Sequence, residues 1–179
     1  TPKPSSAASD VYKRQPDILK RTFSDAAFID RFIGSYAALA QREPSPKPEE
    51  IKLLKELVEL IPKEPAKATE LLEAQVNSGS SGMTHMVLAN LYFQAGRLPE
   101  AAEAYQKCLL GYPEFLRAHK NLGLLYLQLG ELDKALEALS RSVELGDNDG
   151  RTYGLIGYCL LNKGKYLPAE TAYRQAVLN

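Results

Sequence analysis

Residues 123–143 read GLLYLQLGELDKALEALSRSV, and two other stretches of the chain repeat this pattern at a distance of 34 residues. NLYFQAGRLPEAAEAYQKCL occupies residues 90–109, and GYCLLNKGKYLPAETAYRQAV occupies residues 157–177. A glycine and an alanine recur at this spacing in all three stretches: Gly96, Gly130, Gly164, Ala101, Ala135 and Ala169. A fixed period of this size is typical of a solenoid, in which each unit buries its apolar face by stacking on its neighbours. The repeat therefore predicts that the function resides on a surface and not in a pocket.

The composition excludes several classes of function. The chain has 179 residues, with 22 Lys and Arg against 22 Asp and Glu, so no net charge attracts nucleic acid or an anionic membrane. No apolar run reaches the roughly 18 to 20 residues that a transmembrane helix needs, and we expect no direct membrane insertion. The two cysteines, Cys108 and Cys159, occupy different positions in their units and indicate neither a disulfide framework nor a zinc site.

The first part of the chain lies outside the repeat. Residues 1–15, TPKPSSAASDVYKRQ, have no apolar periodicity, and we expect them to be disordered. They resemble a translated sequencing adaptor, which implies a non-native leader, and an ordinary disordered tail is the alternative. Residues 16–43 predict an N-terminal amphipathic helix, because large apolar side chains recur at helical spacing. These side chains are Phe28, Ile29, Phe32, Ile33 and Tyr36.

Two further segments precede the repeat. Residues 44–49 are rich in proline and predict an extended connector. Residues 50–78 predict a degenerate helical hairpin. Its first helix should end near Ile61, because Pro62 disfavours helix at the residue before it. Pro65 suits the first turn of the second helix, so we expect that helix to begin there.

The repeat itself divides residues 82–179 into three units. Counting Gly82 as position one, the units are 82–115, 116–149 and 150–179, of which the last is four residues short. We expect the glycine at position fifteen to end a first helix and a second helix to follow it. Small residues at positions eight and twenty predict that the two antiparallel helices of a unit approach closely. They are Ala89, Gly123, Gly157, Ala101, Ala135 and Ala169.

Residues 82–179 thereby resemble a tetratricopeptide repeat (TPR) protein. The family's small residue at position eight, its alanine at position twenty and its large residues at positions seven, eleven and twenty-four are matched in all three units. Tyr92 and Tyr126 keep the usual tyrosine of position eleven, which Leu160 replaces. The resemblance implies an all-α fold, an α-solenoid of antiparallel helix pairs in a right-handed superhelix, here with extra N-terminal helices.

The resemblance also implies where a ligand binds. In TPR proteins the first helices of successive units line a concave groove, through positions two, five, six, nine, twelve and thirteen. In this chain those positions include Met86, Asn90, Phe93, Gln94, Arg117, Lys120, Asn121, Leu124, Leu127, Gln128, Arg151, Leu155, Tyr158, Leu161 and Asn162. We expect this groove to bind a peptide segment of a partner protein.

The charges of the predicted first helices are of one sign. Residues 82–95, 116–129 and 150–163 contain no Asp or Glu, and their cations are Arg117, Lys120, Arg151 and Lys163. This predicts a basic, amide-rich and apolar face, suited to an extended or helical peptide with acidic and apolar residues. The alternative is that these charges are merely solvated. On the first interpretation, Lys120→Glu or Asn121→Ala should weaken binding and leave the melting temperature nearly unchanged.

Three more specific sites are not supported by the residues. His85 and His119 lie at equivalent positions of adjacent units, at least about 8 to 10 Å apart, so they predict packing in place of the family's usual tryptophan and no metal site. No acid–base pair, nucleophile or phosphate loop is present, so we expect no enzymatic activity and no cofactor. The carboxylate clamp of chaperone-binding TPR domains is matched by Asn90, Asn121 and Arg151 but not at Met86 and Leu155, and we reject it.

These observations predict a non-enzymatic scaffold that binds a protein partner. The overall string is similar to bacterial TPR proteins of the cell envelope, which implies an accessory of a bacterial envelope complex. That similarity favours the periplasm or envelope over the cytoplasm, and the compartment stays open. The alternative is a structural subunit that forms a homo-oligomer through the apolar face of the last repeat. We expect no nucleic acid partner.

Overall fold

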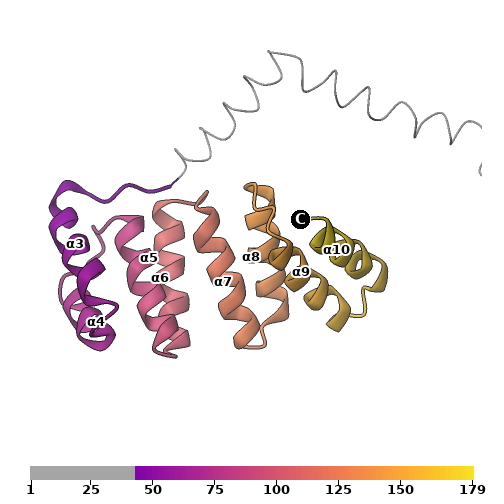
Figure 1. The fold of residues 1–179 in the computed structure, drawn as a ribbon, viewed down its shortest axis with the longest axis horizontal. Coiled ribbons are helices and arrows are strands. Elements are labelled where there is room, and N and C mark those ends of the chain that lie inside the picture. The colour runs from indigo at the N-terminus through magenta and orange to yellow at the C-terminus, as the bar shows by residue number, and fades with distance from the viewer. Residues whose placement is uncertain (1–42) are drawn as a thin grey trace, which may run out of the picture. The chain divides into compact units, whose positions relative to one another are not determined.

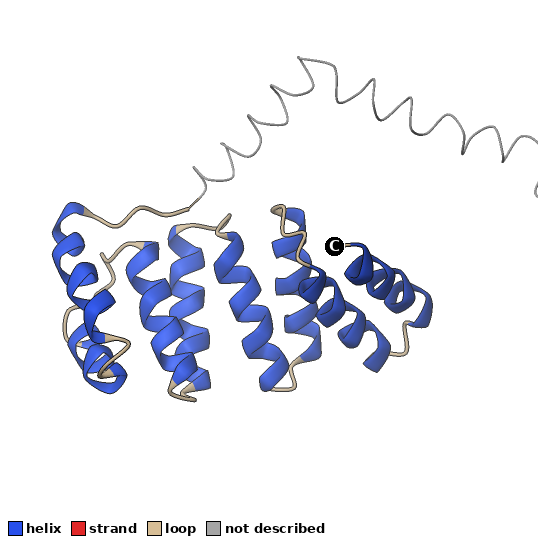
Figure 2. Ribbon diagram, in the orientation of Figure 1, coloured by secondary structure: helices blue, strands red, loops and turns tan. Residues whose placement is uncertain are grey.

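The structure, a computed structural model, describes residues 43–179. These residues form eight α-helices and one short 3-10 helix, and no strand occurs among them (Figure 2). The elements are η1 (Pro48–Glu50), α3 (Ile51–Leu60), α4 (Pro65–Glu73), α5 (Gly82–Gln94), α6 (Leu98–Gly111), α7 (Leu116–Gln128), α8 (Leu132–Glu144), α9 (Gly150–Asn162) and α10 (Tyr166–Leu178). The predicted leader at 1–15 and the predicted helix within 16–43 lie outside the described residues, apart from Glu43.

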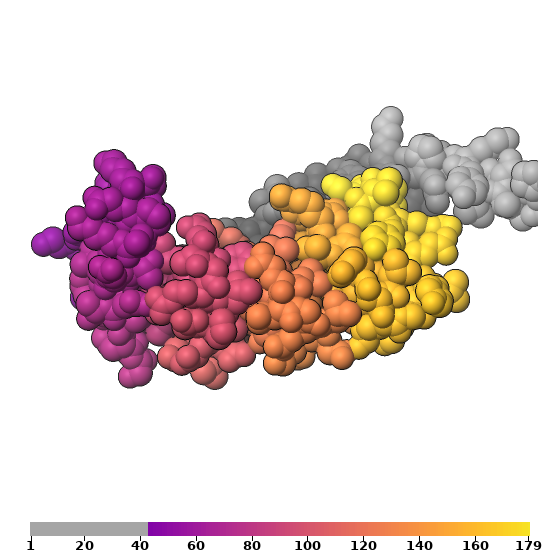
Figure 3. Space-filling view, turned by 90° about the horizontal axis from the view of Figure 1, so that it is seen from below, coloured from indigo at the N-terminus to yellow at the C-terminus, as the bar shows by residue number. Residues whose placement is uncertain are grey.

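The helices follow one another in chain order along one array (Figure 1). The most extensive contacts join α5 to α6, α7 to α8 and α9 to α10, and smaller contacts between α6 and α7 and between α8 and α9 join these pairs. The space-filling view shows the same order as successive bands of colour (Figure 3). The predicted all-α solenoid of helix pairs is confirmed.

Each first helix ends two residues before the glycine that the repeat predicts as its stop. The three glycines have φ angles of 74°, 74° and 70°, in the left-handed region that favours glycine: Gly96, Gly130 and Gly164. After α5, the amide of Arg97 donates to the carbonyl of Tyr92 at 2.9 Å, and equivalent bonds close the other two turns. A Cβ on any of these glycines would meet nothing within 4 Å, so the backbone angle and not the available space requires glycine.

Small residues at positions eight and twenty allow each pair of helices to approach closely. A Cβ on Gly123 would lie 2.6 Å from Cγ of Leu139 on α8, and one on Gly157 would lie 3.0 Å from the ring of Tyr173 on α10. The alanines of position twenty are no more than 1 % exposed: Ala101, Ala135 and Ala169. The predicted close crossing within each pair is therefore confirmed.

The core runs along the array in two clusters. The larger one extends from α5 to α9, and its largest fully buried side chains include Tyr105, Phe115, Leu125 and Leu139. The smaller one joins α3 and α4 to α5 through Leu57, Leu72 and Leu88. The second cluster makes α3 and α4 part of the same array. The prediction that residues 50–78 form a degenerate helical hairpin remains a proposal.

A buried carboxylate attaches the N-terminal segment to the start of α5. Glu50, which is 9 % exposed, accepts the backbone amides of Ser81 at 2.7 Å and Lys47 at 2.9 Å. Burial raises the pKa of Glu50, but hydrogen bonding to the side chain of Ser81 and to the amides of Ser81 and Lys47 outweighs it and holds the pKa below 4.5. The ionised side chain therefore joins η1 to the N-cap of α5, where anions are favoured.

Candidate peptide-binding face

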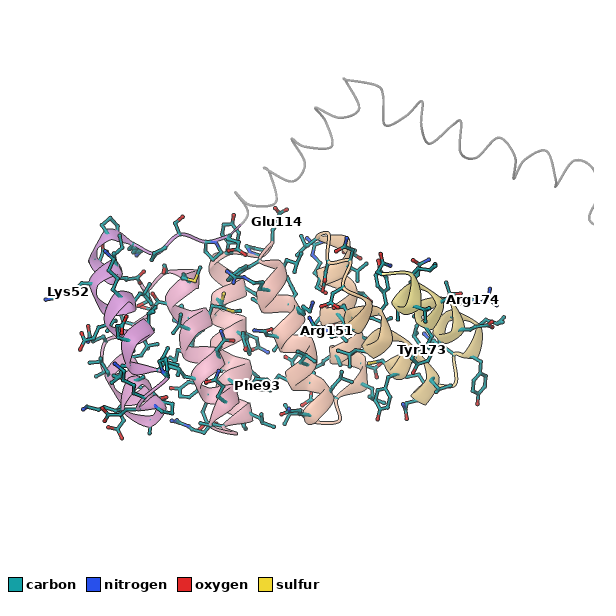
Figure 4. The ribbon with its side chains drawn as sticks, in the orientation of Figure 1. Lys52, Phe93, Glu114, Arg151, Tyr173 and Arg174 are labelled. Carbon is teal, nitrogen blue, oxygen red and sulfur yellow. The ribbon has the colours of Figure 1, made fainter. Side chains whose placement is uncertain are left out.

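The predicted ligand-binding residues lie on α5, α7 and α9, and we call this surface the first-helix face. Seven of them are exposed: Gln94, Arg117, Gln128, Arg151, Tyr158, Leu161 and Asn162. Seven are half-buried: Asn90, Phe93, Lys120, Asn121, Leu124, Leu127 and Leu155. Figure 4 labels Phe93 and Arg151, which come from α5 and α9.

Met86 does not belong to this surface. Its side chain is only 5 % exposed, and it lies in the same core cluster as Ala89 and Tyr105. The expectation that Met86 contacts a ligand is wrong, because burial of an apolar side chain in the core is more favourable than its exposure on the face. Its equivalent in the next unit, Lys120, carries a charge and stays partly exposed.

Two asparagines on the face are held in place by a buried tyrosine. Oδ1 of Asn90 accepts the hydroxyl of Tyr105 at 2.6 Å and Nδ2 of Asn121 at 3.0 Å. Tyr105 is fully buried on α6, and burial raises its pKa to about 12, so its hydroxyl remains a donor. Nδ2 of Asn90 and Oδ1 of Asn121 form no hydrogen bond within residues 43–179. The Asn90–Asn121 amide pair thus offers one fixed donor and one fixed acceptor.

The cations of the face are not free. Nη2 of Arg117 lies 2.6 Å from Oε2 of Glu43, which precedes η1, and Lys163 forms an ion pair with Asp133 of α8. These acidic residues come from outside the first helices, so the composition of α5, α7 and α9 alone could not reveal them.

A second group of acidic residues neutralises the start of α9. Asp149 lies 2.9 Å from Nζ of Lys120 and 2.7 Å from Nη2 of Arg151. Hydrogen bonds from Arg151 and then Lys120 hold the pKa of Asp149 well below its usual range. Together with Asp147, four carboxylates therefore oppose the four predicted cations. The expectation of a basic face is wrong for this reason.

Asp147 is the buried centre of that group. It is 7 % exposed and accepts the hydroxyls of Thr152 at 2.7 Å and Ser142 at 3.3 Å, together with the amide of Asp149 at 3.1 Å. Nζ of Lys120 lies 3.3 Å from it. Its partners come from α7, α8 and α9, so Asp147 joins two repeat units. Lys120→Glu would disturb this cluster, so we now expect it to lower the melting temperature and not to leave it nearly unchanged.

Sequence reasoning missed Tyr105, Asp147 and Asp149. Tyr105 carries a signal only through its place: it stands at the large position twenty-four, where its hydroxyl needs a partner when the ring is buried. Asp147 stands where the first unit has Pro113, and this exchange of a proline for an acid was the available signal. For Asp149 there was no signal in the sequence beyond its place directly before α9.

The predicted packing of His85 is confirmed. The side chain is 7 % exposed, and its Nδ1 has no hydrogen-bond partner among the residues that the structure describes. His119, its equivalent, bonds through Nε2 to the carbonyl of Pro113 at 2.8 Å. In the described part of the chain, no three side chains of the metal-binding types come close enough to hold a metal ion.

The stability of the protein should depend on pH through His85. Burial, reinforced by Lys107 and opposed by Glu50, lowers the pKa of His85 below 6.5. The unfolded chain therefore binds this proton more readily, and the free energy of unfolding should fall as the pH falls through about 6.5. His85→Phe should reduce this dependence, and Tyr153 shows that an aromatic ring fits the equivalent position. The urea midpoints of the unchanged chain and of His85→Phe, measured at about pH 7.5 and about pH 5.5, give the pH dependence of stability for each. Equal pH dependence in both would contradict the assignment.

Neither cysteine of the described residues is a reactive thiol, and no described helix suits a membrane span. Cys108 and Cys159 are both fully buried, and burial raises the pKa of Cys108 to about 12 and that of Cys159 above 9.0. Neither thiol is therefore activated as a nucleophile. Among residues 43–179, we find no helix that combines the length and the apolar character needed to span a bilayer.

The last helix leaves a large apolar surface exposed. Exposed fractions are 70 % for Tyr166, 38 % for Tyr173 and 88 % for Val177, and with Leu161 they line a hollow of about 840 Å³. Figure 4 labels Tyr173 and Arg174 at this end of the array. The equivalent faces of α6 and α8 contact α7 and α9, so this surface suits another helix.

Comparison with known proteins agrees with the repeat seen in the sequence and in the fold. Two family models described as tetratricopeptide repeat match residues 86–150 and 150–178. A relative in Bos taurus, BBSome complex member BBS4, is 29 % identical over 108 residues, which are 60 % of this chain and 21 % of that protein. The matched part thus spans about a fifth of the relative.

Solved structures share the fold. A crystal structure of MamA protein is 26 % identical, with a TM-score of 0.63 over 70 % of this chain and 69 % of that one. A second MamA structure is 23 % identical, with a TM-score of 0.65 over 86 % and 93 %. The second TPR of Spaghetti (RPAP3), bound to HSP90 peptide SRMEEVD, is 19 % identical, with a TM-score of 0.52 over 59 % and 97 %.

Proposed function

We propose, from the premise that this chain belongs to the tetratricopeptide repeat family, that its first-helix face binds a peptide segment of a partner protein. The chain is a protein-interaction scaffold, as its repeats and the structures that share them indicate. The peptide in the RPAP3 structure supports the finer proposal as an example of a TPR domain that holds a short segment.

The Asn90–Asn121 amide pair is the observation that carries this proposal. A peptide bond has one acceptor and one donor, its C=O and its N–H. The free Nδ2 of Asn90 can donate to the carbonyl, and the free Oδ1 of Asn121 can accept from the amide. Because Tyr105 already holds Asn90, little rotational freedom of that side chain is lost on binding, which favours affinity.

The neutral charge of the face changes the proposed partner. Each cation already lies beside a carboxylate. An acidic ligand therefore gains less binding free energy on this face than it would on a basic face without neighbouring carboxylates. We therefore propose a peptide with apolar residues, and we expect its acidic residues to contribute little to the affinity. An accessory role in a bacterial envelope complex remains our proposal, and it rests on the overall resemblance of the sequence alone.

A peptide-display selection tests this function. We expect a random library of about 12-residue peptides to yield ligands whose affinity falls about tenfold in Asn121→Ala, since one hydrogen bond to the ligand is lost and its partner stays unpaired. Calorimetry with one selected peptide measures the change. Gln175→Ala, which removes an exposed amide from α10, is the matched control and should bind normally.

Two outcomes would contradict the proposed function. The first is a selection that yields no ligand for the folded protein. The second is a set of ligands whose affinities are the same for Asn121→Ala, Gln175→Ala and the unchanged chain. Urea denaturation of each variant shows beforehand that the fold is intact.

The exposed face of α10 supports a second candidate function, self-association. Val177 is 88 % exposed beside the hollow, so Val177→Glu should abolish any oligomer that uses this face. Val58 of α3, 69 % exposed at the other end of the array, supplies the control Val58→Glu. Light scattering should give a mass above 19.8 kDa for the unchanged chain and for Val58→Glu, and 19.8 kDa for Val177→Glu. A monomeric unchanged chain would contradict this candidate.

A further inference from the structure

We infer that this protein has a second binding site, separate from the first-helix face, in which a small neutral phenol binds beside His85. The site is a pocket of about 260 Å³ whose walls come from α5, α6 and the loop that precedes α5. None of the residues that line it belongs to the first-helix face, so this inference does not depend on the proposed function. We call it the His85 pocket.

The imidazole ring of His85 is the polar group that a ligand would meet. The side chain lies in the wall of the pocket and is 7 % exposed, and its Nδ1 is buried without a hydrogen-bond partner among residues 43–179. Most buried polar atoms have such a partner, because burial without one costs free energy. Burial also lowers the pKa of His85, so near pH 7.5 the ring is neutral and has one donor and one acceptor.

The repeat shows why His85 lacks a partner. In the next unit, Nε2 of His119 bonds to the carbonyl of Pro113 at 2.8 Å. Gly79 stands at the position equivalent to Pro113, but its carbonyl accepts Nζ of Lys47. The segment before η1 thus occupies the group that serves the equivalent histidine. The ring of His85 is left with a hydrogen bond that a ligand can complete.

The size and the walls of the His85 pocket suit a single aromatic ring. A water molecule takes up about 30 Å³ in the liquid, so this pocket holds a ligand of roughly nine non-hydrogen atoms. Leu88 and Ala104, each 4 % exposed, supply apolar contacts. The rings of His85 and Tyr92 also line the pocket and can pack against an aromatic ligand.

The charged side chains around the pocket favour a ligand without charge. Glu100 lies 2.9 Å from Nε of Arg97, and Glu103 lies 2.7 Å from Nζ of Lys107. Each charge of the wall therefore already has an opposite charge beside it. A phenol adds no charge, and its hydroxyl can both donate and accept, so it matches the neutral imidazole whichever nitrogen carries the proton.

NMR of the histidine rings tests the site, because the 179-residue chain has only two histidines. We expect 4-methylphenol, added up to about 20 mM at about pH 7.5, to shift the ring signals of His85 with a Kd of about 1 mM or tighter. The ring signals of His119 should not move, since its Nε2 is already bonded. Loss of one set of signals in His85→Phe assigns the two rings.

Two matched substitutions and a charged ligand show what holds the phenol. His85→Phe keeps an aromatic ring and removes the hydrogen bond, so the affinity for 4-methylphenol should fall about tenfold in ligand-observed NMR. His119→Phe makes the same change one unit further along and should bind normally. The unchanged chain should bind 4-methylbenzoate several-fold more weakly than 4-methylphenol, since burial of its charge is costly.

Four outcomes would overturn this inference. They are no saturable shift at His85, equal shifts at both histidines, equal affinities of His85→Phe and His119→Phe, and tighter binding of 4-methylbenzoate than of 4-methylphenol. Urea denaturation shows beforehand that both variants are folded, and the titration of the unchanged chain decides the question even if one is not. Each outcome leaves peptide binding on the first-helix face untouched, because the two sites share no residue.

Discussion

Tyr105→Ala should lower the free energy of unfolding by about 3 to 5 kcal/mol. Tyr105 is fully buried in the larger core cluster, so removal of its ring leaves a cavity between α5 and α6 and their neighbours. The change also removes the hydroxyl that bonds to Asn90 at 2.6 Å. Urea denaturation followed by circular dichroism measures the loss. Leu139 is the fully buried equivalent in the next unit, so Tyr105→Leu should cost much less than Tyr105→Ala.

Tyr105→Phe separates packing from the role of the hydroxyl. It keeps the ring, and we expect it to cost only about 1 kcal/mol of stability, because one hydrogen bond is lost. The side chain of Asn90 then keeps only its hydrogen bond from Asn121 and is held less firmly, so peptide affinity should fall although the protein stays folded. A Tyr105→Phe protein with unchanged affinity would show that the Asn90–Asn121 amide pair does not need this support. A Tyr105→Ala protein as stable as the unchanged chain would contradict the core described above.

Asp147→Ala should lower the free energy of unfolding by about 2 to 4 kcal/mol. The carboxylate accepts the hydroxyls of Ser142 and Thr152 and lies beside Lys120. Its removal leaves the fully buried hydroxyl of Thr152 without a partner and takes one of two partners from each of Ser142 and Lys120. Because the three come from α8, α9 and α7, we expect the last repeat unit to separate first. The same urea experiment measures the change.

A matched acid on the same part of the array controls for this substitution. Glu137 lies on α8 and is exposed, so Glu137→Ala should change stability by less than about 0.5 kcal/mol. Hydrogen exchange of α9 and α10 in Asp147→Ala shows whether the last unit is loosened. Equal urea midpoints for Asp147→Ala and Glu137→Ala would mean that the buried cluster does not contribute to stability.

Most of the fold could be predicted because it depends on local rules that recur. A glycine with φ near 74° ends α5, and equivalent glycines end α7 and α9, since the turn requires an angle that other residues rarely adopt. Gly123 was assigned to a close crossing from its place in the repeat, and its contact with Leu139 confirms this. The period identified these residues before any contact was known.

The candidate site was predicted less well, because the accessibility and charge of a residue depend on neighbours that are distant in the chain. Met86 stands at a predicted groove position, yet it is buried in the core. Arg117 was assigned to a basic face, yet it pairs with Glu43, 74 residues away in sequence. Asn90 was predicted as a residue of the face and remains a proposal, and the sequence pattern did not show that Tyr105, in the same unit, holds its carbonyl oxygen.

The 34-residue period was enough to establish an all-α solenoid of helix pairs, since each helix, turn and close crossing is encoded within one unit and then repeated. The stacking of the units decided the charge and the hydrogen bonds of the first-helix face. It brings Asp147 and Asp149 against Lys120 and neutralises the face, and it sets Asn121 of one unit against Asn90 of the one before. Charges and hydrogen bonds act over a few ångströms in space, whatever the separation in sequence, so only the tertiary structure could decide that this face is neutral and that two of its amides are paired.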